Sequence, residues 1–528
     1  MIEAFESFVV RAAEAPLLAR GEPLMARAAF ALAGAVVREL REHPRTAPVP
    51  GRGRTARPVL SGTRAVLLVG PGNNGGDTLM AGALLARRGV HVCAVLAADR
   101  VHDAGLAALR AAGGTVASVA PADAAALVRS ADVVLDGLLG IGGNGGLRGG
   151  ARDLARATGA ALAGLPPGAR PVVVAVDLPS GIGVDDGAAD EAVLTADLTV
   201  TFGAVKPGLL LPPAAERAGR IEVVDLGLDL APRSTVRRLA AADLAARGIL
   251  APPPPGAHKY TRGVLGVVAG TQQFPGAAVL AVSGAVRAGV GMVRYLGSRE
   301  VTAAVLAARP EAVPAGGRVQ AWALGPGVPA APAVTDDASR AQQARIRQAL
   351  AQVTGLLAAD VAGEAVPAVV DAGAIGLLPV DCPPWVVITP HAGELAELLR
   401  SRGESVERAD VEAHPLVWAR RARELTGATV LLKGATTVVV GPGVTYAQAD
   451  GPSWLATAGA GDVLTGLLGA LLAAHSTAAV KDPGLPALLA ASASLLHGRA
   501  AHRANPGGPV AALDVAQALP ATIAELLA

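Results

Sequence analysis

Short apolar runs that alternate with helical patterns most constrain the fold of this chain. In the first half these runs occupy Arg64–Val69, Val90–Leu96, Val133–Leu135, Val172–Val176, Leu198–Phe202 and Ile221–Val224. In the second half they occupy Val264–Val268, Met292–Tyr295, Ala321–Leu324, Ala368–Val370, Val386–Ile388 and Thr429–Leu432. Helical patterns separate many of them, for example at Thr78–Arg88, Leu147–Ala163, Ala277–Ala288 and Val411–Leu425. Because short strands alternating with helices build parallel sheets, we predict an α/β fold with doubly wound parallel sheets.

A change in composition divides the two series of strands. Leu226–Ala257 contains Pro232, scattered charges and the run Pro252–Pro255, which cannot continue a helix or a central strand. A length of 528 residues is enough for two domains of ordinary size. Hydrophobic residues make up 52% of the chain but aromatic residues only 2%, so the cores must consist of Ala, Val and Leu. We therefore expect one domain over residues 1–230 and another over 236–528.

Charge and cysteine content exclude several classes of protein. Lys and Arg number 46 against 44 Asp and Glu, which offers no electrostatic argument for a nucleic acid or a membrane surface as partner. The only cysteines, Cys93 and Cys382, form no disulfide framework or zinc-ligand spacing, so we expect a cytoplasmic protein. The start of the chain lacks the basic region of a signal peptide. The uncharged stretches Val264–Val286 and Val463–Val480 are broken by Gly and polar residues, and we interpret them as buried strand–helix units.

Polar residues follow three strands of the first half. Gly70-Pro-Gly-Asn-Asn-Gly75 matches the dinucleotide-binding pattern, but Gly140–Gly145 matches it too, so the pattern alone is not specific. Asp136 and Asp177 end apolar runs, and Ser180 follows closely. The carboxyl ends of parallel strands meet in one crevice, where such oxygens suit a hard cation. The alternative is that each residue caps its own helix or turn, but three such positions favour a functional site.

The first half resembles NAD(P)H-hydrate epimerase domains, which interconvert the two epimers of a hydrated nicotinamide. The resemblance rests on Gly70–Asp77 and on Asp177-Leu-Pro-Ser-Gly181, covers about residues 1–230 and implies a Rossmann-like, three-layer domain. It implies proton transfer by Asp177 and a potassium site formed by Asn74, Asp136 and Ser180. It also implies substrate contacts from Asn73, Asn74, Gly75, Gly76, Asp77, Gly140, Ile141, Gly142, Gly143, Asn144, Gly145, Gly146 and Asp177. Thr78 departs from the family's common Gly.

The stretch Leu455–Ala470 organises the second half. Thr457, Gly459 and Gly461 precede an apolar helical run, and small residues there let backbone N–H groups face a phosphate. A carboxylate at Asp462 would repel that phosphate, which makes sense if Asp462 takes a proton from an attacking hydroxyl. The alternative is that Asp462 only complements the helix dipole. No Walker A sequence is present, which excludes a P-loop kinase.

Other motifs of the second half also follow strands. Gly325-Pro-Gly327, Thr389-Pro-His391 and Lys433-Gly-Ala-Thr-Thr437 should gather with Asp462 at one edge of the sheet. Together they resemble the ribokinase-like superfamily and, within it, the ADP-dependent NAD(P)H-hydrate dehydratases, over about residues 240–528. The resemblance implies ADP as co-substrate with magnesium. It implies substrate contacts from Ala277, Gly327, His391 and Asp462, and nucleotide contacts from Lys433, Gly434, Ala435, Thr436, Thr437 and Gly461. Ala460 lacks the hydroxyl that relatives carry there.

The two resemblances converge on one damaged cofactor. They predict a bifunctional enzyme that epimerises the R and S hydrates of NADH and NADPH (NADHX and NADPHX) and dehydrates the S form with ADP, giving AMP and phosphate. One alternative is a ribokinase-type, ATP-dependent kinase of a vitamin precursor, fused to a nucleotide-binding domain. Another is a nucleotide sensor without catalysis, which the presence of Asp462 and Lys433 disfavours. We expect a homo-oligomer.

Overall fold

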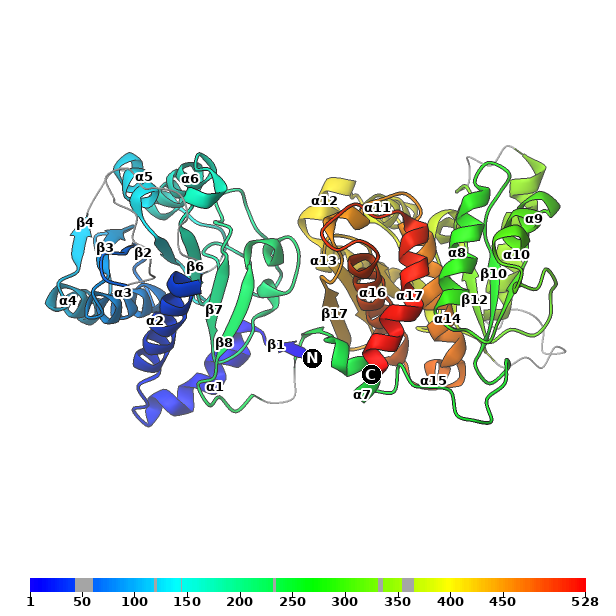
Figure 1. Ribbon diagram of the computed structural model, residues 1–528, viewed down its shortest axis with the longest axis horizontal. Coiled ribbons are helices and arrows are strands. Elements are labelled where there is room, and N and C mark those ends of the chain that lie inside the picture. Colours follow the sequence, from blue (N-terminus) through cyan, green and yellow to red (C-terminus); the bar gives the residue numbers. More distant parts are fainter. Residues whose placement is uncertain (43–59, 118–120, 144, 231–233, 331–335, 354–364) are drawn as a thin grey trace. The chain divides into compact units, whose positions relative to one another are not determined.

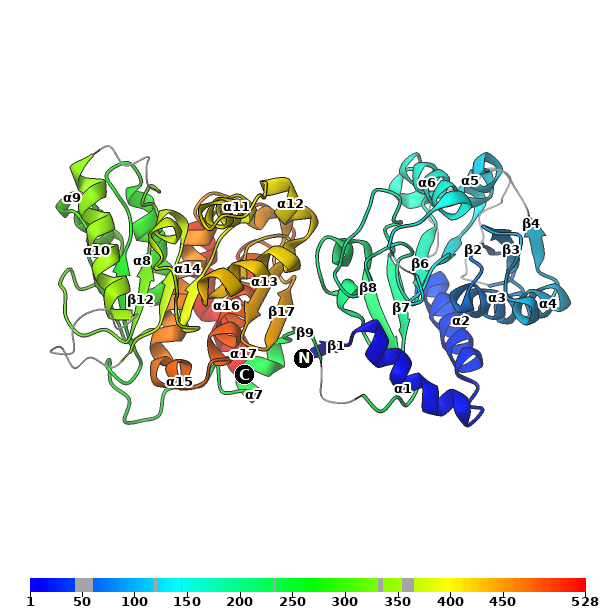
Figure 2. The same cartoon turned by 180° about the vertical axis from the view of Figure 1, so that it is seen from behind.

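A computed structural model describes residues 1–42, 60–117, 121–143, 145–230, 234–330, 336–353 and 365–528. The chain forms two compact units, one spanning Glu3–Thr235 and the other Val236–Ala528 together with Met1–Ile2. Each unit is a parallel or mostly parallel sheet with helices on both faces, which confirms the predicted α/β fold (Figures 1 and 2).

The first unit contains a seven-stranded sheet in the order β4-β3-β2-β5-β6-β7-β8, and every pair is parallel. The strands are β2 (Arg64–Val69), β3 (His91–Leu96), β4 (Thr115–Ala117), β5 (Val133–Gly137), β6 (Val172–Val176), β7 (Leu198–Phe202) and β8 (Arg220–Val224). The helices are α1 (Ser7–Ala19), α2 (Leu24–Glu42), α3 (Asn73–Ala86), α4 (Asp103–Ala111), α5 (Pro121–Ser130) and α6 (Gly149–Ala163). Figure 1 shows α2 and α3 on one face of the sheet and α5 and α6 on the other. Two apolar clusters, one on each face, form the core.

The glycine-rich stretch after β2 is helical rather than a loop. The sequence pattern places the helix from Thr78, whereas α3 begins at Asn73. Close packing explains the difference, since a Cβ on Gly75 would lie 2.1 Å from the carbonyl oxygen of Gly70. Thr78 donates a hydrogen bond to the backbone of Asn74 at 2.7 Å and fits because Gly137 opposite it has no side chain. The substitution at Thr78 is thus accommodated inside the helix.

The second unit contains a ten-stranded sheet in the order β1-β9-β17-β16-β15-β14-β13-β12-β10-β11. Its strands are β1 (Ile2–Ala4), β9 (Val236–Arg238), β10 (Val264–Val268), β11 (Met292–Tyr295), β12 (Ala321–Leu324), β13 (Ala368–Val370), β14 (Val386–Ile388), β15 (Thr429–Leu432), β16 (Thr437–Gly441) and β17 (Val444–Gln448). The strands from β11 to β15 are parallel, while β16 and β17 form an antiparallel hairpin. The sequence analysis missed that hairpin together with β1 and β9.

Helices cover both faces of the second sheet (Figures 1 and 2). They are α7 (Ala241–Ala246), α8 (Pro275–Arg287), α9 (Arg299–Ala308), α10 (Asp337–Val353), α11 (Ala392–Ser401), α12 (Arg408–Ala413), α13 (Pro415–Thr426), α14 (Ala460–Ala474), α15 (Ser476–Lys481), α16 (Leu485–Ala504) and α17 (Ala512–Leu527). The helix expected over Val411–Leu425 is divided into α12 and α13, because Pro415 begins a new helix.

Glycines allow α8 and α14 to approach closely. A Cβ on Gly284 would lie 2.4 Å from the carbonyl oxygen of Val463, and one on Gly466 would lie 1.9 Å from that of Ala281. Residues of both helices belong to one large core of mostly Ala, Val and Leu. The packing fixes the N-terminus of α14, where Asp462 lies, against the start of α8.

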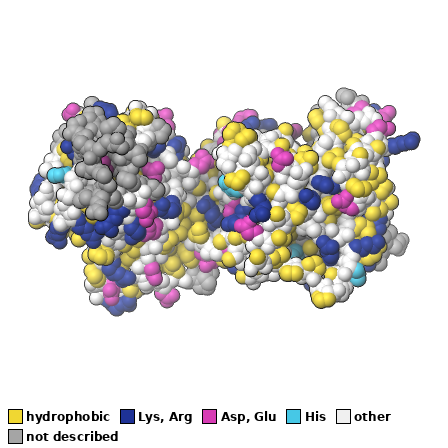
Figure 3. Space-filling view, in the orientation of Figure 1, with side chains coloured by type: hydrophobic (Ala, Val, Ile, Leu, Met, Phe, Trp, Pro, Cys, Tyr) yellow, Lys and Arg dark blue, Asp and Glu magenta, His cyan; other side chains and the backbone are white. Residues whose placement is uncertain are grey.

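The described surface mixes charges of both signs. On the face shown in Figure 3, basic and acidic side chains are scattered among apolar ones. Among the helices that the structure describes, none combines the length and the apolar character needed to cross a bilayer.

Candidate active sites

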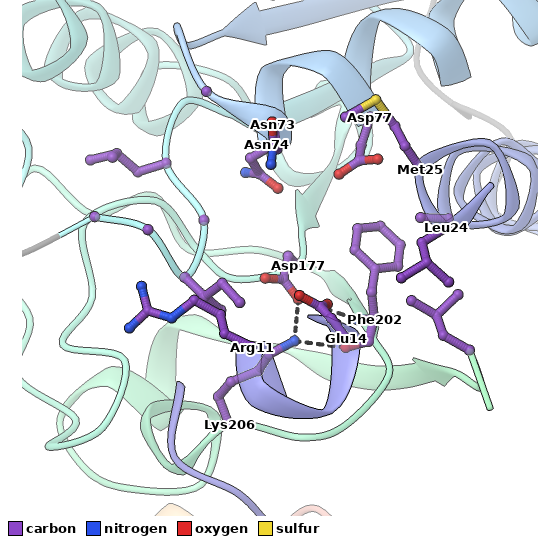
Figure 4. A pocket seen from close by; sticks show the side chains of 18 of the residues that line it. Arg11, Glu14, Leu24, Met25, Asn73, Asn74, Asp77, Asp177, Phe202 and Lys206 are labelled. Carbon is purple, nitrogen blue, oxygen red and sulfur yellow. Dashed lines mark hydrogen bonds and ion pairs between the residues drawn. The ribbon is translucent and has the colours of Figure 1, made fainter. Parts of the chain in front are cut away.

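The first unit has a cavity of about 490 Å³ at the carboxyl edge of its sheet. Eight of the predicted substrate contacts line it, namely Asn73, Asn74, Asp77, Gly140, Ile141, Gly142, Gly143 and Asp177. Arg11 and Glu14 from α1 and Leu24 and Met25 from α2 complete one wall (Figure 4). The cavity therefore combines an apolar lining with a few charged groups, which suits a small-molecule site.

Asp177 lies directly after β6 in a left-handed backbone conformation with φ of 66°. Its Oδ1 accepts hydrogen bonds from the Thr201 hydroxyl at 3.1 Å, from the Phe202 backbone N–H at 3.2 Å and from the Lys206 ammonium. A left-handed backbone conformation is uncommon for Asp and strains the chain locally. Its presence at the edge of a cavity therefore points to a functional position. All three donors bind the same oxygen, which leaves Oδ2 for a ligand.

Lys206 is 1% exposed and fully satisfied. Its three ammonium protons have three acceptors, since Nζ also lies 3.0 Å from the Thr201 hydroxyl and 2.9 Å from the Phe202 carbonyl oxygen. A buried ammonium is stable only when paired and hydrogen-bonded in this way. The Lys206–Asp177 ion pair therefore fixes the orientation of the Asp177 side chain.

Two further carboxyl groups share this cavity. Burial, with the nearby charges of Asp177 and Glu14, raises the pKa of Asp77 to about 8. Burial also raises the pKa of Glu14, an effect that Lys206 partly offsets. Oδ1 of Asp77 is buried without a hydrogen-bond partner, and so is Nδ2 of Asn74. Polar atoms in that condition are rare in folded proteins, and here both belong to residues that line the cavity.

Of the residues predicted to bind potassium, Asn74 lines the cavity, while Asp136 and Ser180 contact each other and do not line it. The backbone N–H of Ser180 donates to Oδ2 of Asp136 at 2.9 Å, and the hydroxyl of Ser180 lies 2.9 Å from the backbone nitrogen of Leu139. Asp136 is 1% exposed, and no Lys or Arg of the described chain pairs with it. Burial raises the pKa of Asp136. In the part of the chain that the structure describes, no three His, Cys, Asp or Glu side chains come together, so a zinc-type site is not seen there.

Some predicted contacts lie away from this cavity. Gly75 and Gly76 are buried inside α3, where they face Gly70 and His102 respectively. Gly145 and Gly146 do not line the cavity, and Asn144 lies outside the described residues.

The second unit has a cavity of about 530 Å³ between the starts of α8 and α14. Three of the four predicted substrate contacts line it, namely Ala277, Gly327 and Asp462. Gly459, with φ of 86°, caps α14 because a Cβ there would lie 2.4 Å from a methyl group of Leu280. Asp462 thus lies in the first turn of α14, where backbone N–H groups remain available to an anion.

A charged network lies beside Asp462. The buried carboxylate of Asp371 accepts from Lys433 at 2.9 Å and from the Thr465 hydroxyl at 2.9 Å. Burial lowers the pKa of Lys433, but Asp371 and Glu394 outweigh burial and the pKa is raised. Burial and then Asp371 raise the pKa of Asp462 to about 7, against the opposing effect of Lys433. Asp462 can therefore exchange a proton near neutral pH, as a general base must.

The remaining predicted residues surround this network. His391 is the N-cap of α11, where its side chain accepts a hydrogen bond from the Glu394 N–H at 3.1 Å, and 57% of that side chain is exposed. A Cβ on Gly461 would lie 3.3 Å from Nζ of Lys433, so these two predicted nucleotide contacts are neighbours. Gly434 and Ala435 are exposed in the turn after β15, while Thr436 and Thr437 are buried. None of these residues lines the 530 Å³ cavity.

Comparison with known proteins decides the family. The bifunctional NAD(P)H-hydrate repair enzyme Nnr of Mycobacterium tuberculosis is 42% identical over 480 residues, which are 88% of this chain and 88% of that protein. The chain belongs to the bifunctional NAD(P)H-hydrate repair enzymes. The family sequence model described as NAD(P)H-hydrate dehydratase matches residues 265–520, and the one described as the YjeF-related protein N-terminus matches residues 21–208.

Single-function relatives match each half separately. The NAD(P)H-hydrate epimerase of Clavibacter michiganensis is 44% identical over 237 residues, which are 44% of this chain and 93% of that protein. The crystal structure of the ADP/ATP-dependent NAD(P)H-hydrate dehydratase of Bacillus subtilis with ATP and Mg²⁺ is 26% identical, with a TM-score of 0.42, and covers 53% of this chain and 95% of that chain. The two halves of the chain thus match proteins and family models of different description.

Sequence reasoning about this repair enzyme missed Lys206, Asp371 and Thr465. A signal for the lysines was present, because the chain has only four lysines among its 46 basic residues. Lys206 and Lys433 are two of those four, and both bind a buried carboxylate that follows a strand. Arginine's fork is larger and cannot replace a compact ammonium in such a space. In an arginine-rich chain, a lysine that follows a strand therefore indicates a position where a compact ammonium group is needed.

Proposed function

We propose that the chain repairs hydrated nicotinamide cofactors in two steps, each in its own domain. Residues 1–230 epimerise the R and S hydrates of NADH and NADPH. Residues 236–528 dehydrate the S hydrate with ADP, giving AMP and phosphate. Membership of the bifunctional repair family supports both activities. The observation that carries the residue-level proposal is that each unit has its own cavity lined by a carboxyl group, which is buried in the first unit (Asp77, Asp177) and half-buried in the second (Asp462).

In the second domain, dehydration begins with phosphoryl transfer. The hydroxyl of the S hydrate attacks the β-phosphate of ADP while Asp462 takes its proton, and AMP leaves. Lys433 and the N-terminus of α14 balance the negative charge of the transferring phosphoryl group. The phosphate ester is a better leaving group than hydroxide, so phosphate leaves with the C–O bonding electrons, the adjacent ring carbon loses a proton to phosphate or solvent, and the ring double bond of NADH or NADPH is restored. Ala277 and Gly327, which line the same cavity, bring substrate close to Asp462, and His391 contributes a further contact from outside that cavity.

Magnesium would accompany the nucleotide in this domain. Both oxygens of Asp371 are occupied by Lys433 and Thr465. Glu394 is 21% exposed, and its Oε2 accepts a hydrogen bond from the backbone N–H of His391 at 2.8 Å, so its other oxygen, Oε1, would hold the ion. A hard divalent cation supplies charge neutralisation at the phosphates. Self-association and a cytoplasmic location stay predictions from the sequence.

One assay tests the proposal. The full chain is incubated with mixed R and S hydrates of NADH, first with ADP and then with ATP, and the products are separated by chromatography. We expect both hydrates to disappear with ADP, with NADH and AMP as products. Turnover of ATP on a vitamin-type alcohol with both hydrates unchanged would instead support a vitamin-precursor kinase. Tight ADP binding without turnover would support a sensor.

We also propose that the first domain binds potassium through Asn74, Asp136 and Ser180. Two observations support this proposal. Asp136 is a buried carboxylate without a basic partner among the described residues. The side-chain amide nitrogen of Asn74 is buried without a hydrogen-bond partner, and turning the amide group by 180° puts its oxygen in that position. Oxygen ligands of this kind suit a hard monovalent ion. Exchanging potassium for tetramethylammonium should abolish epimerisation while dehydration of the pure S hydrate continues. Undiminished epimerisation in potassium-free buffer would refute the proposed potassium site.

A further inference from the structure

Two carboxyl groups face the first cavity from opposite walls. Figure 4 shows Asp77 pointing inward from α3 and Asp177 across the cavity, after β6. Lys206 binds Oδ1 of Asp177 and leaves Oδ2 toward the cavity. Oδ1 of Asp77 is buried without any partner. One carboxyl group is thus paired with an ammonium through one oxygen, and the other has no cation of its own beside it.

Epimerisation must break a bond at the hydroxyl-bearing carbon of the hydrated ring. That carbon is also bonded to the ring nitrogen, so two routes exist. The C–O bond can break, with the nitrogen lone pair forming an iminium ion, or the C–N bond can break and open the ring to an aldehyde. Only the first route needs an acid on one face of the ring and a base on the other.

We propose that Asp77 and Asp177 form an opposed acid–base pair that inverts this carbon by loss of water on one face and addition of water on the other. The proposal rests on the epimerase function proposed above. Asp77 gives its proton to the hydroxyl, the C–O bond breaks, and one water leaves. The iminium ion is then attacked from the opposite face by a second water, whose proton passes to Oδ2 of Asp177.

The proton balance makes the pair reversible. After one inversion Asp77 is ionised and Asp177 protonated, which is the form needed to convert the opposite epimer back. One water is released and one is consumed, so no oxidant, reductant or co-reactant takes part. The carboxylates also stabilise the positive charge of the iminium ion while it exists.

The electrostatics of the cavity agree with this assignment. Asp77, with a pKa raised to about 8 by burial and neighbouring carboxylates, stays protonated at neutral pH and can act as the acid. The charged or titratable groups around it are Asp177 after β6, Lys206 after β7, Glu14 and Arg11 on α1, and His102 at the start of α4. The rate should fall as the pH rises above about 8, because the acid form of Asp77 is then lost.

Labelled water tests the proposal on the unaltered protein. The full chain is incubated without nucleotide with the pure R hydrate in H₂¹⁸O, and early S product is analysed by chromatography and mass spectrometry, with an enzyme-free sample subtracted. We expect one ¹⁸O in each molecule of S hydrate formed by the enzyme. An S product that keeps its original oxygen would overturn the proposal in favour of ring opening. A wild-type chain that forms no S hydrate would refute the epimerase function itself.

A variant separates catalysis from structure. Asp77→Asn should slow epimerisation by about 10²–10⁴-fold, the usual effect of losing a general acid. The slow residual rate should lack the fall above pH 8 that the wild type shows. Asp153→Asn, on the exposed surface of α6, serves as the matched control and should keep the wild-type rate. An Asp77→Asn protein with wild-type epimerisation, or with an unchanged fall above pH 8, would contradict the proposal.

Discussion

The two domains place the carboxylate that we propose as catalytic at the same edge of similar sheets but surround it differently. In the first domain Asp177 is bound by a fully buried lysine, and other carboxyl groups share its cavity. In the second domain the lysine binds Asp371 instead, and Asp462 lies free of it in the first turn of a helix. This difference in surroundings matches the charge of the group that reacts in each domain, which is negative for a phosphate and positive for an iminium ion. Phosphates need an available ammonium and helix N-terminus, whereas an iminium ion needs carboxylates.

The largest expected effect comes from removing the base of the second domain. Asp462→Asn should slow dehydration by about 10²–10⁴-fold, since the general base is lost while the shape is kept. ADP affinity should hold or rise, because a negative charge leaves a phosphate site. Epimerisation by the same protein is the internal control. Near-wild-type dehydration would mean that Asp462 has only a structural role in the first turn of α14.

The stretch around Asp462 also shows what the sequence can predict. The apolar strands from Val264 to Leu432 were identified because buried parallel strands are continuous apolar runs. Loops after parallel strands necessarily meet at one edge, so grouping Lys433 with Asp462 needed no coordinates. The short β9 and the hairpin β16–β17 were missed. β9 has only three residues, too few to show a strand-like alternation of apolar and polar residues. β16 begins at Thr437, which the sequence analysis assigns to a nucleotide-binding loop.

Other features depend on packing that no local pattern reveals. Asn73–Asp77 has a loop-like composition, and its helix exists because Gly70, Gly75 and Gly137 permit close backbone contacts. The Lys206–Asp177 pair joins residues 29 positions apart, and the Lys433–Asp371 pair joins residues 62 apart. Motif matching identified one member of each pair. The other member of each pair, Lys206 or Asp371, is identified only once the arrangement of the strands in the sheet is known.

The next effect concerns the buried lysine that distinguishes the first domain. Lys206→Met leaves Asp177 buried without its cation, and breaking a buried pair in this way costs about 3–5 kcal/mol. Thermal unfolding of the full chain should show the transition of the first domain shifted down and that of the second unchanged. Lys481→Met, which removes an exposed lysine, is the matched control. Equal stability of the two variants would mean that the ion pair contributes no net stability.

The smallest effect is a difference in pH dependence. Asp462 must be ionised to accept a proton, and its pKa is raised to about 7. Dehydration should therefore fall about tenfold for each pH unit below 7, whereas epimerisation should fall above pH 8. Rates from pH 5 to 9, with ADP binding measured over the same range, separate protonation of Asp462 from that of the nucleotide. Dehydration that is constant down to pH 5 would exclude Asp462 as the titrating base.

Complementation tests most directly the claim that two independent sites act in sequence. Asp177→Asn and Asp462→Asn are prepared as full chains and given the R hydrate of NADH with ADP, separately and mixed. Each variant alone should form little NADH, the first because R hydrate is not epimerised and the second because S hydrate accumulates. The mixture should form NADH at a rate approaching that of the wild type. A mixture as inactive as its components, or a single variant that loses both activities, would contradict the account.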